Sequence, residues 1–76
     1  MSKARPRFAV CIDNEGTPAS IEIGKVYRIL RAEKIARDIG LIRVVDESGE
    51  DYLYQADQFV DVKLPRAARA AVLRGR

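Results

Sequence analysis

The sequence predicts a small, mainly β protein: an antiparallel barrel of about five strands with one short helical insertion and a basic C-terminal tail. Two observations predict this class. Short runs of strand-forming residues, separated by turn residues, follow one another from residue 8 to residue 64. Between residues 32 and 40, apolar and charged residues instead repeat at the four-residue spacing of a helix. Because 76 residues suffice for one small domain, we expect one barrel over 8–64 and basic tails at 1–7 and 65–76.

The first half of the barrel is predicted by alternation and turn chemistry. Residues 8–13 alternate in the manner of a strand. Residues 14–18 hold a glycine and a proline two positions apart, which is typical of a loop. Residues 25–31 are rich in strand-forming side chains. Alternation leaves two faces open for the core side of that strand: Tyr27 with Ile29, or Val26 with Leu30.

The helical insertion is expected within residues 32–40. One apolar pair and two acid–base pairs are each spaced four residues apart, as neighbours on one helical face are. These pairs are Ile35 with Ile39, Glu33 with Arg37, and Lys34 with Asp38. Gly40 stands where a helix C-cap glycine belongs. We therefore expect one or two helical turns that end at Gly40.

The second half of the barrel is predicted to be a hairpin and a closing strand. Residues 41–45 and 51–54 are strand-like, and residues 46–50 place a glycine inside a short polar loop between them, which is a strong hairpin signal. Residues 55–58 predict a single turn. Residues 59–64 predict the last strand.

The C-terminal tail is helix-prone. Pro65 cannot donate to a strand ladder but suits the first turn of a helix, and residues 67–74 are rich in alanine. Written as a helix, Leu64, Ala68 and Val72 form a weak apolar stripe. Because a helix of about ten residues is marginal alone in water, two alternatives stay open: a frayed tail, or a basic segment that docks on phosphates or folds onto a partner protein.

This order and spacing of elements resembles the SH3-like barrel over residues 8–62. In that family a short opening strand and an irregular loop precede an apolar-x-x-Gly-Asp-apolar-x-apolar strand. A hairpin, a short 3₁₀ turn and a last strand follow. Residues 21–29 match the second strand, with Lys25 in place of the usual aspartate. The run Gly-Glu-Asp-Tyr-Leu-Tyr at residues 49–54 also resembles small uncharacterised bacterial proteins, and that resemblance implies no activity.

The residues with which SH3 domains bind peptides are replaced in this chain. Those domains grip proline-rich peptides in an aromatic groove, notably with a tryptophan at the start of the third strand. Leu41 takes that place, the chain has no tryptophan, and Gln55 stands where the family has a proline. The resemblance therefore implies the fold, and we expect no proline-rich peptide as a partner.

Charge is distributed unevenly along the chain. All eleven carboxylates lie between residues 8 and 62, whereas eight of the fourteen bases lie in the two ends. The high isoelectric point of about 9.4 therefore describes the tails and not the body. This distribution weakens the idea that the barrel itself is a basic, nucleic-acid-binding surface.

The densest charge is the acidic turn, which holds four carboxylates: Asp46, Glu47, Glu50 and Asp51. Carboxylate oxygens are ligands for Ca²⁺ and Mg²⁺. The spacing does not match an EF-hand loop, however, and the two arms of a hairpin diverge, so the four need not converge. We expect a solvated turn whose charges discourage pairing of sheet edges.

The sequence indicates no catalytic constellation. Cys11 is the only cysteine and the chain has no histidine, which excludes zinc sites of the usual composition. Cys11 therefore lacks the usual activating base, and we expect it to be a small, partly buried hydrophobic residue. Nor is there a glycine loop that cradles phosphate. We predict a protein that is not an enzyme and that has no cofactor or metal.

The aromatic residues and the tail supply the candidate site. Tyr52 and Tyr54 share one strand face, and they either belong to the core or face outward and stack on a ligand. We expect the core, together with Tyr27, Phe8 and Phe59, because a 76-residue chain with only five aromatic residues needs them inside. The candidate partner-binding residues are Arg66, Arg69, Arg74, Arg76, Leu41 and Tyr54.

Two functions of different classes follow. The first is a protein-interaction module with a protein partner whose identity the sequence does not specify. The second is an accessory RNA- or DNA-binding protein that uses the basic termini. No apolar run approaches the roughly 18 residues of a membrane span and no signal peptide is evident, so we expect a cytoplasmic protein with no membrane partner.

Overall fold

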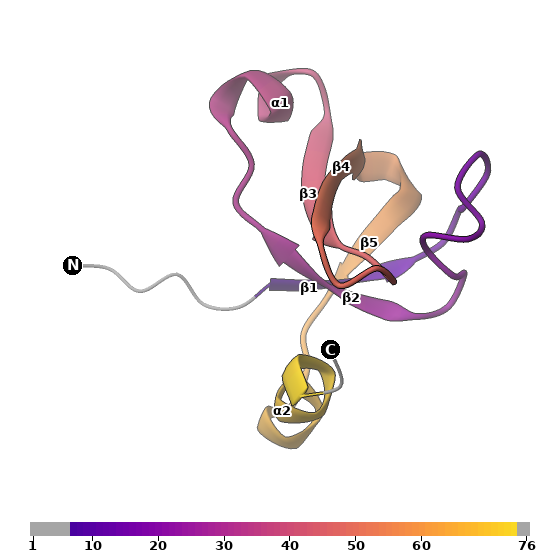
Figure 1. Ribbon diagram of the computed structural model, residues 1–76. Helices are drawn as coiled ribbons and strands as arrows, with labels where there is room; N and C mark the ends of the chain where they lie inside the picture. The colour runs from indigo at the N-terminus through magenta and orange to yellow at the C-terminus, as the bar shows by residue number, and fades with distance from the viewer. Residues whose placement is uncertain (1–6, 75–76) are drawn as a thin grey trace.

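The computed structural model describes residues 7–74 and is mainly β, as predicted. Five antiparallel strands form one sheet in the order β4-β3-β2-β1-β5. The sheet curls strongly, so that one of its faces becomes an interior (Figure 1). The strands are β1 (Arg7–Cys11), β2 (Val26–Leu30), β3 (Leu41–Val45), β4 (Asp51–Gln55) and β5 (Phe59–Val62). The shorter elements are α1 (Lys34–Asp38), the 3₁₀ turn η1 (Ala56–Gln58) and α2 (Arg66–Arg74).

The interior is filled by alternate side chains from the inner face of the sheet and by one loop residue. The core consists of Ala9, Cys11, Ile21, Tyr27, Ile29, Val44, Tyr54 and Phe59. The ring centroid of Phe59 lies 6.2 Å from that of Tyr27 and 6.0 Å from that of Tyr54, in edge-to-face geometry. The predicted core positions of these three aromatic residues are confirmed. The same prediction is wrong for Tyr52, which is 50% exposed. Of the two faces left open for β2, the inner one carries Tyr27 and Ile29.

Both faces of β1 are covered. Ala9 and Cys11 are fully buried on the inner face, so Cys11 is the small buried residue that the sequence predicted. Phe8 points to the outer face and is nevertheless only 3% exposed, because it lies beside Val62 and Leu64. The outer face of the sheet therefore has an apolar patch of its own, next to the C-terminal segment.

The second strand is shorter than the sequence predicted. Residues 12–25 form an irregular loop with turns, and β2 begins only at Val26. Gly24 adopts φ +88° and donates its N–H to the Cys11 carbonyl at 2.7 Å, so the chain turns there instead of extending. Ile21 still fills the core from within this loop, with no exposed surface. The match of residues 21–29 to a second strand is therefore wrong for residues 21–25, which belong to the loop.

The helical insertion is confirmed, with a different buried face than its isoleucines suggest. Gly40 adopts φ +83° and donates its N–H to the Arg37 carbonyl at 3.0 Å, as a helix-ending glycine does. Ala36 is the buried residue of α1, whereas Ile35 is 79% exposed and Ile39 is 70% exposed. A single helical turn buries little more than one residue, and here the small alanine is the one that packs closely.

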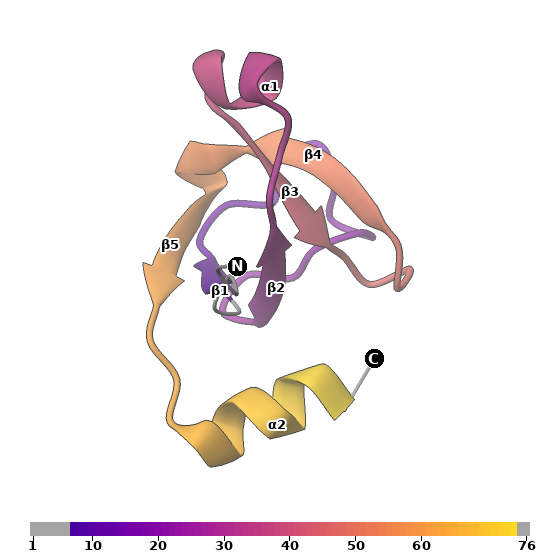
Figure 2. The ribbon, with the colours of Figure 1, turned by 90° about the vertical axis from the view of Figure 1, so that its left-hand side faces the viewer.

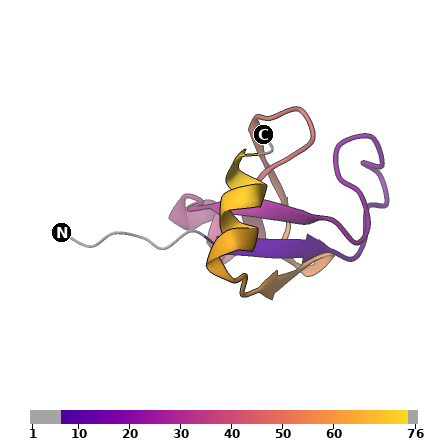
Figure 3. The same cartoon turned by 90° about the horizontal axis from the view of Figure 1, so that it is seen from below.

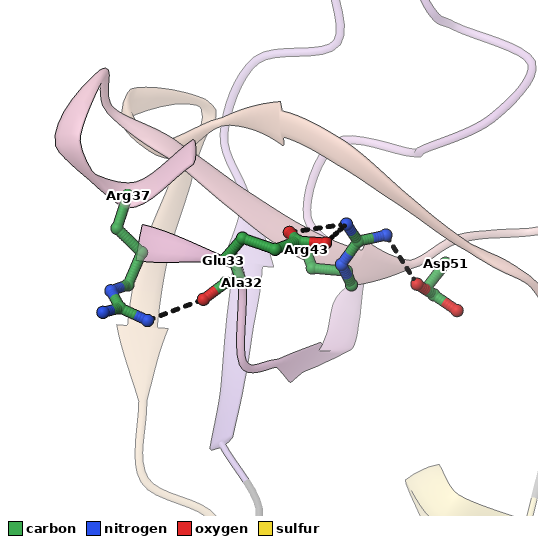
Figure 4. Close-up of polar contacts among 5 residues, drawn as sticks. All are labelled: Ala32, Glu33, Arg37, Arg43 and Asp51. Atoms are coloured by element: carbon green, nitrogen blue, oxygen red, sulfur yellow. Dashed lines mark hydrogen bonds and ion pairs between the residues drawn. The ribbon is translucent and has the colours of Figure 1, made fainter. Parts of the chain in front are cut away.

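One of the two predicted ion pairs in this insertion forms, and the other does not. Lys34 binds Asp38 at 2.8 Å. Glu33 instead binds Arg43, at 2.8 and 3.0 Å, and Arg43 also binds Asp51 at 2.9 Å (Figure 4). Arg37 turns away and donates to the Ala32 carbonyl at 2.6 Å. The expected pair of Glu33 with Arg37 is therefore wrong, because the guanidinium of β3 lies between two carboxylates and binds both.

The C-terminal segment is a helix that lies against the sheet. α2 crosses β1 and β2 on the outer side of the sheet, at the end of the molecule opposite α1 (Figure 2, Figure 3). Leu64, Ala68 and Val72 are half-buried, so the predicted apolar stripe is the side of the segment that packs. The frayed alternative is therefore wrong for residues 66–74, and packing on the sheet stabilises a helix that would be marginal alone.

Candidate functional site

The first feature of the candidate site is a set of bases without acidic partners. The basic helix cluster comprises Lys63, Arg66, Arg69 and Arg74. Within residues 7–74, none of these four side chains forms an ion pair. Because α2 contains no acidic residue, the helix cannot neutralise itself. The apolar stripe anchors α2 on the sheet and leaves its charges available to a partner.

A groove lies between α2 and the β1–β5 edge of the outer face. Its volume is about 770 Å³, and it is lined by Arg7, Phe8, Asp61, Val62, Lys63, Leu64 and Arg69. Arg7 and Asp61 are bound to each other, with the Arg7 Nη2 atom 3.2 and 3.3 Å from the two carboxylate oxygens. The other two bases of the groove, Lys63 and Arg69, belong to the basic helix cluster. This α2 groove therefore combines an apolar wall with uncompensated positive charge.

The strand register explains why the groove forms here. Phe8 pairs with Val62 on one side and with Arg28 on the other, so these three residues lie in one row across the outer face. Pro65 follows the last strand and allows the chain to turn into α2. Arg28 is exposed and has no ion pair in the described part of the chain, so it adds a further base to this face.

The acidic turn has the opposite character. Asp46 is only 2% exposed and accepts hydrogen bonds from the Ser48 N–H at 2.9 Å, the Ser48 hydroxyl at 2.6 Å and the Tyr54 hydroxyl at 2.6 Å. Burial acts to raise the pKa of Asp46, but these hydrogen bonds outweigh it and hold the pKa below its ordinary value. The predicted hairpin turn is present, but the expectation that it is solvated is wrong for Asp46.

The remaining carboxylates of the turn also have partners in the barrel. Glu47 accepts from the Tyr27 hydroxyl at 2.5 Å and pairs with Lys25 at 2.7 Å. Burial, together with this hydrogen bond, raises the pKa of Tyr27 above its ordinary value. Glu50 accepts from Tyr52 at 2.9 Å, and Asp51 pairs with Arg43 as described above. Among the described residues, no three metal-ligating side chains lie close enough to share an ion. The carboxylates of the turn therefore stabilise the barrel.

The two barrel residues predicted to bind a partner have different environments. Tyr54 is 8% exposed, and its hydroxyl is committed to Asp46. Burial and then this hydrogen bond raise the pKa of Tyr54 to about 12. Tyr54 therefore has no free ring face for stacking. Leu41 is half-buried at the start of β3 and lines a smaller groove of about 380 Å³ with Ile39, Gln55 and Ala56 among others.

The predicted tail residues come together only in part. Three of the predicted residues, Arg66, Arg69 and Arg74, lie on α2 and belong to the basic helix cluster. The fourth, Arg76, lies outside the described residues. The prediction missed Arg28, which lies far from the tail in sequence. Arg7 was predicted only as part of the basic N-terminal tail, and the structure places it in β1. Alternation contained the signal for Arg28, because an inward Tyr27 and Ile29 place it on the outer face.

Cys11 offers no chemistry at the surface. It is fully buried in the core, and burial raises the pKa of its thiol.

Neither helix of the described chain has the length and apolar character of a membrane span. Comparisons of the chain with protein-family models, with curated proteins and with solved structures gave no match. Any functional proposal for this chain therefore has to be argued from the geometry of its own residues.

Proposed function

We propose that this protein is a nucleic-acid-binding module that uses the basic helix cluster, without catalysis. The observation that carries the proposal is that α2 is anchored on the sheet while its arginines have no acidic partner in residues 7–74. A basic tail that merely neutralised the acidic barrel would pair with its carboxylates. This segment packs through its apolar stripe instead, which leaves Arg66, Arg69 and Arg74 available for phosphates.

We further infer an SH3-like barrel as the scaffold. The strand order β4-β3-β2-β1-β5 and the 3₁₀ turn between the last two strands support that assignment. A cytoplasmic location stays a prediction from the sequence. In this proposal the acidic turn maintains the barrel, and the outer face beside α2 binds the polyanion.

The test is an equilibrium titration of the full chain against a mixed-sequence single-stranded oligonucleotide, followed by fluorescence anisotropy at several salt concentrations. We compare Arg66→Gln/Arg74→Gln on α2 with Lys34→Gln/Arg37→Gln on α1. Both double variants remove two positive charges, and the two helices lie at opposite ends of the molecule (Figure 1, Figure 2). The α2 variant should bind about tenfold more weakly and lessen the slope of log K against log salt by about 1.4.

Two outcomes would contradict the proposal. Absence of binding by the full chain at low salt is the first. An equal loss of affinity in the α1 and α2 variants is the second, because it would show that net charge alone attracts the oligonucleotide.

A second candidate function, a protein-interaction module, is favoured by one observation. Ile35 on α1 and Ile39, the residue directly after α1, are largely exposed, and Ile39 lines the smaller groove with Leu41. Neighbouring exposed apolar side chains beside a groove are typical of protein contacts. A photo-crosslinking residue at position 39 should give a discrete protein adduct in cells, and one at Val60, which is 48% exposed, should not. Equal adducts at both positions would rule out a specific partner at α1.

A further inference from the structure

We infer that the α2 groove takes one unpaired nucleotide, so that the partner is a single-stranded nucleic acid and not a duplex. This inference rests on the proposed function and adds the class of nucleic acid. It follows from the composition and the position of the groove, taken together.

The groove can bind both ends of a nucleotide. Lys63 and Arg69 supply two cations with no carboxylate partner in the described chain, which suits a phosphate. Val62 and Leu64 supply a half-buried apolar wall, against which a base or a sugar can pack. Arg7 lies at the same groove and is held by Asp61. The volume of the groove, about 770 Å³, is within the range of about 300–1,000 Å³ that is common for small-molecule sites.

The rest of α2 extends the phosphate contacts beyond this groove. Arg66 is three residues from Arg69, so their side chains are neighbours on the helix. Arg74 lies at the other end of the helix, and Arg28 lies on β2, the strand that α2 contacts. A strand with one nucleotide in the groove can therefore continue along the helix over further cations.

A duplex cannot use the groove in the same way. Its bases are paired and stacked, so none can reach the apolar wall unless it leaves the helix. A duplex would contact only the outward cations, Arg66 and Arg74. A flexible single strand exposes its bases and combines base packing with backbone contacts.

The experiment compares the full chain's affinity for a mixed-sequence 12-nucleotide strand with its affinity for the blunt duplex of the same sequence. Two single variants match in charge: Arg69→Gln in the groove and Arg66→Gln outside it. We expect the single strand to bind about tenfold more tightly than the duplex. Arg69→Gln should weaken single-strand binding about tenfold and Arg66→Gln only about threefold. Duplex binding should be weakened by Arg66→Gln and left unchanged by Arg69→Gln.

Methyl NMR provides a readout that does not depend on any variant. The single strand should shift the Val62 and Leu64 methyl signals, the duplex should not, and Ile35 on α1 should stay unchanged with both. Equal affinity for strand and duplex, with equal effects of the two variants, would overturn the groove inference and leave the proposed function standing. Failure of both nucleic acids to bind at low salt would overturn the proposed function as well.

Discussion

Two charged segments of this molecule, residues 46–51 and residues 63–74, each hold four charged side chains and have opposite structural roles. The first holds four carboxylates, and each has a hydrogen-bond or ion-pair partner within the barrel. The second holds four bases, and none has an acidic partner in the described chain. The contrast shows that charge density in a sequence does not identify a binding site. What distinguishes the two segments is whether the fold already satisfies their charges.

Substitution of Asp46 is the most direct test of this contrast. Replacement of Asp46 by alanine removes a buried acceptor and leaves the Tyr54 and Ser48 hydroxyls without it. We expect the free energy of unfolding to fall by about 3 kcal/mol, as for other buried hydrogen-bonded charges that lose a partner. Urea denaturation measures this change. Glu50→Gln in the exposed part of the same turn is the control, with an expected change below about 0.5 kcal/mol.

If Asp46→Ala were as stable as Glu50→Gln, the contrast between the segments would fail. The carboxylates of the turn would then have to be regarded as available for binding, as the bases of α2 are.

Alkaline pH tests the same hydrogen bond through deprotonation of its donor, the Tyr54 hydroxyl. Burial and the hydrogen bond to Asp46 raise the pKa of Tyr54 from 10.0 to about 12. Because the folded pKa is the higher one, the contribution of Tyr54 to stability is complete below pH 10 and is lost as the pH rises through about 12. We expect the free energy of unfolding to fall over this window by up to about 2 kcal/mol.

Tyr54→Phe is the matched variant for this prediction. It should start from a lower stability and lose less between pH 10 and pH 12, as followed by urea denaturation at each pH. Part of the decline should persist, because the pKa of Tyr27 is also raised. An identical decline in both proteins would show that Tyr54 does not carry the effect.

Glu47 ties the turn to the long loop, and its loss should be felt locally. Its carboxylate binds Tyr27 and Lys25, and its backbone N–H donates to the Ser20 carbonyl at 2.9 Å. We expect Glu47→Ala to lower the free energy of unfolding by about 1–2 kcal/mol. Hydrogen exchange should also become faster at the amides of residues 20–24. Unchanged exchange there would mean that the backbone contact alone holds the loop.

The sequence predicted the parts of this fold that depend on short-range patterns. The hairpin glycine, the helix-ending Gly40 and the stripe of Leu64, Ala68 and Val72 are local signals, and the structure agrees with each. The exposed isoleucines of α1 were not predictable, because periodicity groups residues on one face without saying which face packs. Burial of Asp46 depends on Tyr54, which lies across the hairpin, and no pattern within the turn reveals that partner.

The smallest expected effect on stability concerns the arginines of α2. Arg66 and Arg74 have no acidic partner in residues 7–74 and both are exposed, so their charges contribute little to folding. We expect Arg66→Gln/Arg74→Gln to change the free energy of unfolding by less than about 0.5 kcal/mol, although the same variant should bind the single strand about tenfold more weakly. Urea denaturation and anisotropy on one protein sample compare the two quantities. A loss of stability as large as that of Asp46→Ala would show that the arginines hold the helix in place, and the distinction between a structural acidic turn and an available basic helix would then be lost.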